Sequence, residues 1–257
     1  MIHYAVAFGL LAHVLFWGAG AAMLAMPRPW RRFWPVLVVP AGLALQSALV
    51  WFGALAGLRG TDSYIWASEV VPVALMALAL WRWARLAGWG AAWRMARNDV
   101  ERTGLVWAAA AGCLVLLVLP VALASKGLTS ISLGSCDAAD YAAGARVLME
   151  FARDDRSGFL GLTEVVRVHS VDNFFDYWLR LNHFTPAALM AFNGSLLGCA
   201  PHETATLMTM VLLAGLLPTV FWASRAVVGY SGGVSLIVAG LFGVSPVMWY
   251  AVAHVSP

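Results

Sequence analysis

The chain has 257 residues, of which 61% are hydrophobic and 11% are charged, and its net charge is +3. A soluble globular domain has about 25% charged residues, so this composition excludes an ordinary soluble protein and indicates an integral membrane protein. The basic residues cluster at the ends of apolar segments and no nucleic-acid-binding motif is present. The charge therefore predicts contact with membrane lipids and no nucleic-acid partner.

Apolar segments long enough to cross a bilayer, which takes about 20 residues, follow one another along the chain. Six are found, at residues 2–26, 33–58, 64–86, 103–124, 204–228 and 232–255. No positively charged region precedes the first, so we expect a retained helix rather than a cleaved signal peptide. The predicted fold class is an all-α polytopic membrane protein with about six transmembrane helices.

The arginines predict the orientation of these helices. Nine of them follow the first, third and fifth segments: Arg28, Arg31, Arg32, Arg82, Arg85, Arg94, Arg97, Arg102 and Arg225. The short loop on the other side contains only Arg59. The positive-inside rule then places the nine arginines in the cytoplasm and puts the N-terminus and the loop 125–203 outside.

Two features of the early segments predict contacts inside the membrane. Gly18 and Gly20 are followed by two alanines, and such small residues let helices approach closely. Glu69 is the only acidic residue inside a predicted span, and an intramembrane acid is a functional candidate by default. The alternative for Glu69 is a structural pair with Arg59.

The loop 125–203 contains nine of the 13 acidic residues, and two of them are candidate catalytic groups. Asp137 is predicted to N-cap a helix that runs to about residue 152, and Asp140 lies one turn further on, beside Tyr141. Near a bilayer surface such a carboxylate can act as a base or bind a cation. The alternative gives Asp137 a capping role only and makes Asp140 a solvated charge.

The second half of the loop predicts two further helices. Residues 171–181 form an amphipathic pattern with Arg180 on its polar face, which favours a helix on the membrane surface. Thr185 is the predicted N-cap of a helix that ends at Gly198. His183 precedes this helix, where it could bind phosphate, act as an acid or base, or only cap.

Cys136 and Cys199 flank the loop on the side expected to be oxidising, so we predict a disulfide between them. Closing a loop of this length should stabilise the fold by about 4 kcal/mol. The alternative is a pair of free thiols in a reducing compartment. A divalent metal held by loop carboxylates is also possible, but no ligand spacing is diagnostic, so no metal ligand is assigned.

Residues 137–146 (Asp-Ala-Ala-Asp-Tyr-Ala-Ala-Gly-Ala-Arg) and 182–186 (Asn-His-Phe-Thr-Pro) follow an outward-running helix. This arrangement resembles the first extracytoplasmic loop of the GT-C superfamily of polytopic glycosyltransferases, which includes bacterial relatives of protein mannosyltransferases and of lipid A aminoarabinose transferases. The resemblance divides the chain into three N-terminal membrane helices, 1–103, and a GT-C-like module, 104–257. The family has this loop after its first helix and has a longer chain, so we expect a C-terminally truncated sequence.

The resemblance implies an enzyme in the bacterial inner membrane whose donor is a sugar on a polyprenyl phosphate. Asp137 or Asp140 would then be the general base. Arg146, Arg180 and His183 would balance the charge of the leaving phosphate, and Tyr141 and Glu69 complete the predicted substrate-binding residues.

Two functions outside this class remain as alternatives. The first is a non-enzymatic membrane scaffold or accessory subunit, in which the acidic loop binds a partner subunit; its basis is the lack of diagnostic catalytic motifs. The second is a transporter, which would need intramembrane charges or an internal repeat. Glu69 is the only such charge, and no repeat is apparent.

Overall fold

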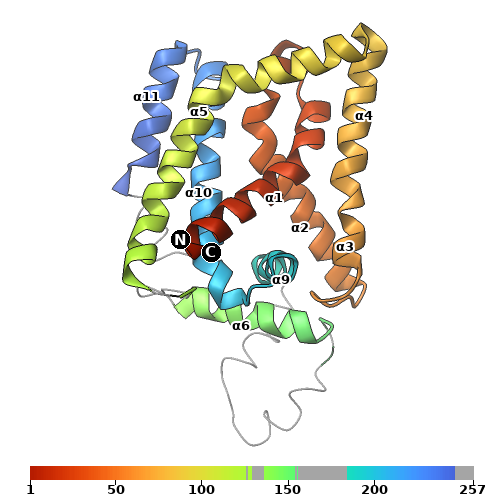
Figure 1. Ribbon diagram of the computed structural model, residues 1–257, viewed down its shortest axis with the longest axis vertical. Helices are drawn as coiled ribbons and strands as arrows, with labels where there is room; N and C mark the ends of the chain where they lie inside the picture. The colour runs from red at the N-terminus through yellow and green to blue at the C-terminus, as the bar shows by residue number, and fades with distance from the viewer. Residues whose placement is uncertain (126, 129–135, 154, 156–183, 247–257) are drawn as a thin grey trace, which may run out of the picture. The chain divides into compact units, whose positions relative to one another are not determined.

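The computed structural model describes residues 1–125, 127–128, 136–153, 155 and 184–246. These residues form α-helices and one 3-10 helix, with no β-strand among them (Figure 1). The predicted all-α class is confirmed. The chain forms two compact units, and each draws on separate stretches of sequence.

Unit 1 is formed by the described residues of Met1–Leu45, Glu69–Ala124 and Met210–Tyr250. Its helices are α1 (Ile2–Ala25), η1 (Arg28–Leu37), the first part of α2 (Val38–Leu55), α4 (Val70–Ala87), α5 (Trp89–Ala124), most of α10 (Pro201–Ala226) and α11 (Gly232–Gly243). Helix α5 runs unbroken across residue 103, where the resemblance divides the chain.

Five helical segments of the described chain are long and apolar enough to cross a membrane: Ile2–Ala25, Pro29–Leu55, Tyr64–Ala87, Trp89–Ala124 and Pro201–Ala226. An integral membrane protein is therefore supported, and five of the six predicted spans have a counterpart. The described part of the sixth is the shorter apolar helix α11. The rest of its predicted range, from residue 247, lies outside the described residues.

The fourth span differs from the prediction because α5 begins at Trp89 rather than at residue 103. Its 36 residues correspond to about 54 Å of helix, whereas the hydrocarbon layer is about 30 Å thick. The additional first turns contain charged residues among the apolar ones, and these form the ion pairs Arg97–Glu101 (2.8 Å) and Arg102–Asp99 (3.7 Å). Hydropathy detects only the apolar part of such a helix, so the polar extension was missed.

Helix α1 packs very closely on α2 and α4 at its glycines. A Cβ atom added to Gly18 would lie 1.8 Å from the carbonyl oxygen of Val38, and one added to Gly20 would lie 2.4 Å from the backbone nitrogen of Met76. Gly42 on α2 meets α1 in the same way, because its added Cβ would lie 2.2 Å from the carbonyl oxygen of Val14. The predicted close approach at Gly18 and Gly20 is confirmed.

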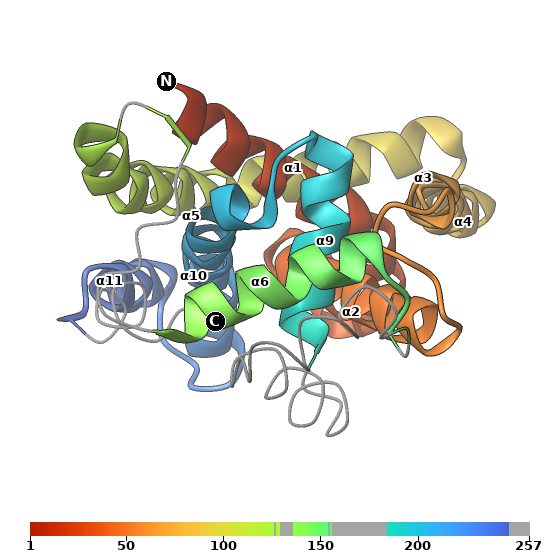
Figure 2. The same cartoon turned by 90° about the horizontal axis from the view of Figure 1, so that it is seen from below.

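Unit 2 is formed by the described residues of Gln46–Ser68 and Ser125–Thr209. It contains the end of α2, α3 (Tyr64–Ser68), α6 (Cys136–Glu150) and α9 (Thr185–Leu197). Helices α6 and α9 cross each other (Figure 2). Alanines and a leucine of α6, including Ala145 and Leu148, are buried, as is most of α9.

The close approach of α1 to α2 predicts that Gly18→Ala destabilises the fold. Alanine is normally better than glycine inside a helix by about 1 kcal/mol, but here its methyl group must push α1 away from Val38. We expect a net loss of about 1–3 kcal/mol, measured as a lower thermal unfolding midpoint in detergent.

The matched control is Gly112→Ala in α5, where an added Cβ meets nothing within 4 Å. Its unfolding midpoint should equal or exceed that of the unchanged protein. A Gly18→Ala variant that is as stable as the Gly112→Ala variant would contradict the packing described for α1.

Candidate functional site

The two predicted catalytic aspartates lie at the start of α6. The helix begins at Cys136, one residue before Asp137, so Asp137 belongs to the first turn and is not the residue that precedes the helix. The N-cap position is two residues before Asp137, so the prediction of Asp137 as the N-cap is wrong. Asp140 follows in the same helix, and the side chains of both aspartates lie outside the described part. Tyr141, the next residue, is half-buried.

Arg146 lies further along α6 and pairs with Glu150, one turn towards the C-terminal end. Its Nε is 2.5 Å from Oε1 of Glu150, and the two side chains are 64% and 48% exposed. Exposed pairs of this spacing contribute only a few tenths of a kcal/mol, so Arg146 can exchange this partner at small cost. The other two predicted phosphate ligands, Arg180 and His183, lie outside the described residues.

The C-terminal end of α6 is held by Gly60 and Thr61, two loop residues for which the sequence predicts no role. The backbone N–H of Gly60 donates to the carbonyl oxygen of Leu148 at 2.6 Å, and the Thr61 hydroxyl donates to that of Met149 at 2.7 Å. The last carbonyl groups of a helix have no partner within the helix, and this loop satisfies two of them.

Helix α9 fixes the same loop from its other side. The Ser195 hydroxyl donates to the carbonyl oxygen of Gly60 at 2.5 Å. A Cβ atom on Gly60 would lie 2.8 Å from the Cβ of Ala191, so only glycine fits without a shift. The loop, α6 and α9 thus form one hydrogen-bonded group, for which the turn-forming residues at 60–62 were the only sequence signal.

Arg59, in the same loop, pairs with Asp62. Its Nη2 lies 2.9 Å from Oδ1 of Asp62, and its backbone N–H donates to Oδ2 at 2.8 Å. The backbone hydrogen bond from Arg59, together with its side-chain hydrogen bond and charge, lowers the pKa of Asp62 against the opposing effect of burial. The alternative prediction that Arg59 pairs with Glu69 is therefore wrong.

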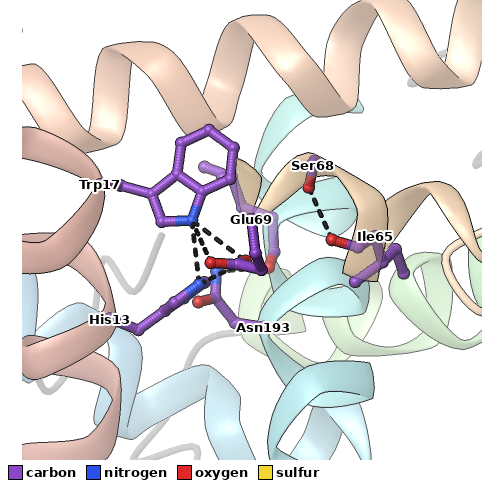
Figure 3. A network of polar contacts seen from close by, with 7 residues as sticks. His13, Trp17, Ile65, Ser68, Glu69 and Asn193 are labelled. Carbon is purple, nitrogen blue, oxygen red and sulfur yellow. Dashed lines mark hydrogen bonds and ion pairs between the residues drawn. The ribbon is translucent and has the colours of Figure 1, made fainter. Parts of the chain in front are cut away.

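Glu69, which directly precedes α4, has its partners on α1 instead (Figure 3). Its Oε1 lies 2.9 Å from Nε2 of His13. The indole N–H of Trp17 donates to both carboxylate oxygens, at 3.1 and 3.2 Å. His13 and Trp17 are one helical turn apart, so a single face of α1 supplies both groups.

The hydrogen-bond roles in this cluster depend on the tautomer of His13. Nε2 of His13 also lies 3.0 Å from Nε1 of Trp17, and it can either donate to Glu69 or accept the indole N–H, but not both at once. The predicted role of Glu69 in substrate binding stays a prediction.

The predicted Cys136–Cys199 disulfide is not found, because Cys199 is a free thiol. Cys199 follows Gly198, which ends α9 in the left-handed conformation with φ +66°. The Cys199 Sγ lies 3.7 Å from the carbonyl oxygen of Leu197. Burial, with a smaller contribution from the charge of Glu203, raises the pKa of this thiol.

The acceptor role of Glu69 predicts different effects for two substitutions. Glu69→Gln keeps an oxygen that can accept from Trp17, whereas Glu69→Ala removes it from a half-buried position. Loss of a buried acceptor costs about 1–3 kcal/mol, so Glu69→Ala should lower the thermal unfolding midpoint more than Glu69→Gln. The control is Glu101→Ala on exposed α5 surface, which should change stability by less than about 0.5 kcal/mol. Equal midpoints for the two Glu69 variants would contradict this assignment.

The free thiol of Cys199 predicts alkylation without prior reduction. Because the raised pKa leaves less thiolate at neutral pH, a maleimide should react with Cys199 more slowly than with cysteine in a short peptide, and the gap should close at alkaline pH. Glu203→Gln should speed the reaction. Peptide mass spectrometry after alkylation measures this, and a disulfide-linked peptide pair containing Cys136 and Cys199 would contradict it.

Within the described part of the chain, no group of three or more His, Cys, Asp or Glu side chains could hold a metal ion. Chemistry-bearing residues gather at the cluster of Glu69, His13 and Trp17 in unit 1 and at the start of α6 in unit 2. No protein-family profile, no curated protein and no solved structure matches this chain.

Proposed function

We propose that this chain is a membrane glycosyltransferase of the GT-C type. It transfers a sugar from a polyprenyl-phosphate donor to an acceptor at the extracytoplasmic face, in a membrane such as the bacterial inner membrane. The observation that carries the proposal is the position of α6, a helix that lies in the chain between the long apolar helices α5 and α10 and has Asp137 and Asp140 at its start.

Helix α6 is a suitable carrier for a catalytic carboxylate because its position in unit 2 is fixed. Its apolar face is buried, and its last carbonyl groups are bound by Gly60 and Thr61. Sites built on such rigid elements hold a reacting group within the narrow limits that catalysis requires. The N-terminal turns extend from this anchored end.

The proposed reaction is a single displacement. The acceptor hydroxyl attacks the anomeric carbon, the aspartate takes the hydroxyl proton, and the bond between the anomeric carbon and the phosphate oxygen breaks. Polyprenyl phosphate leaves with the electron pair of that bond. A carboxylate at the low-dielectric rim of a bilayer gains basicity, which suits it for this role.

The leaving phosphate needs a cation nearby, and Arg146 is a candidate on the same helix. Its exposed pair with Glu150 is weak enough to be exchanged for a phosphate. Arg180 and His183 remain further candidates. Tyr141, half-buried beside Asp140, would contact the sugar.

The test uses the full chain reconstituted in lipid with a panel of polyprenyl-phosphate sugars, and it measures release of polyprenyl phosphate. Asp137→Asn and Asp140→Asn retain a helix-compatible polar side chain, so both should fold. The variant that removes the base should lose about 10²–10⁴-fold in rate, while the other loses much less.

Glu101→Gln, which makes the same chemical change on α5, is the control and should keep full activity. Undiminished release in both aspartate variants would remove the assignment of the base. If the unchanged protein releases no polyprenyl phosphate and instead purifies with a stoichiometric partner subunit, the chain is an accessory subunit and the proposal is wrong.

A further inference from the structure

A pocket of about 510 Å³ lies in unit 1 and is lined by residues of η1, the end of α4 and the first turns of α5. Three arginines line it: Arg31 and Arg32 from η1 and Arg102 from α5. Two basic helical segments that are about 70 residues apart in sequence thus contribute to one cavity. The pocket is separate from α6 and does not depend on the proposed glycosyl transfer.

The pocket has an excess of positive charge. Asp99 is its only acidic lining residue among those described, and it is only 7% exposed. Arg102 approaches it with Nη1 at 3.7 Å from Oδ1. The nearest acid along the helix, Glu101, is paired with Arg97 outside the pocket. One carboxylate therefore faces three guanidinium groups.

Aromatic contacts orient the two arginines of η1. The guanidinium carbon of Arg31 lies 4.1 Å from the centre of the Trp83 ring, which also lines the pocket. That of Arg32 lies 5.1 Å from the Phe33 ring. Stacking restricts the planar guanidinium groups, so that less entropy is lost when their N–H groups bind a ligand.

Guanidinium groups held in this way are the usual ligands of phosphate, which they bind with paired hydrogen bonds. The pocket also lies at the ends of membrane helices, where lipid phosphates are found. Basic pockets between transmembrane helices bind anionic head groups. We propose that the Arg31–Arg32–Arg102 pocket binds a phosphate group, supplied by an anionic lipid head group or by a soluble phosphate.

The test measures retention of phosphatidylglycerol by the full chain in a non-ionic detergent, by native mass spectrometry. The double variant Arg31→Gln/Arg102→Gln should retain at least tenfold less lipid than the unchanged protein. The control Arg94→Gln/Arg97→Gln removes the same charge from α5 outside the pocket and should retain nearly as much. Phosphatidylcholine, which has no net charge, should bind equally weakly to all three.

A second arm separates the two sources of phosphate. Inorganic phosphate is added to each protein. A soluble ligand is indicated if phosphate displaces the lipid and raises the unfolding midpoint of the unchanged protein but not that of the pocket variant. Chloride at equal ionic strength controls for screening. Lipid that stays bound at high phosphate indicates a head-group site.

The proposal fails if both double variants lose lipid equally, because diffuse surface charge then explains the binding, or if neither loses it and phosphate has no effect. Should the pocket double variant not fold, Arg32→Gln replaces it, since the Arg32 side chain is exposed and its loss leaves no cavity. Arg32→Gln should lower lipid retention several-fold, and retention equal to that of the Arg94→Gln/Arg97→Gln control would overturn the proposal.

Discussion

Hydrocarbon offers no hydrogen-bonding partners, and this constraint explains where many polar groups of the described residues lie. The backbone responds by forming helices long enough to cross the bilayer, five of them in the described residues. A polar side chain then lies either at a helix end or in a cluster whose members hydrogen-bond to one another. The arginines of η1 and of the first turns of α5 lie at helix ends, as do the aspartates at the start of α6. Glu69 forms a hydrogen-bonded cluster with His13 and Trp17.

Close packing of helices at small residues makes the cluster of Glu69, His13 and Trp17 possible. Helix α1 contacts α4 so closely at Gly20 that an added Cβ atom would lie 2.4 Å from the backbone nitrogen of Met76. This approach holds the α1 face that carries His13 and Trp17 against the start of α4, where Glu69 lies. The carboxylate is thereby matched by two ring nitrogens, although its partners are 56 and 52 residues away in sequence. In this part of unit 1, the contact between α1 and α4 therefore also provides Glu69 with its hydrogen-bonding partners.

Features that depend on local composition could be predicted from the sequence, and features that depend on contacts between distant residues could not. Apolar runs predicted the spans, and Gly18 and Gly20 predicted close packing. The start of α5 was missed because charged residues interrupt its apolar ones, and because Ala92 and Ala96 are buried against residues that are distant in sequence. His13 gave no signal inside an apolar run, and Gly60 gave only a turn signal. The disulfide prediction failed because sequence position cannot show whether two cysteines meet.

Helix α5 has the arginine pocket at its first turns, and from its last residue, Ala124, the chain continues to α6. With α5 crossing the bilayer once, Glu101 and Cys199 are expected on opposite faces of the membrane. The direct measurement labels two single-cysteine proteins, one with Cys199 and one with Glu101→Cys, with a membrane-impermeant maleimide in intact cells. We predict that Cys199 reacts from outside and that the cysteine at position 101 reacts only after the membrane is opened. Reaction of both cysteines from the same side would contradict the account.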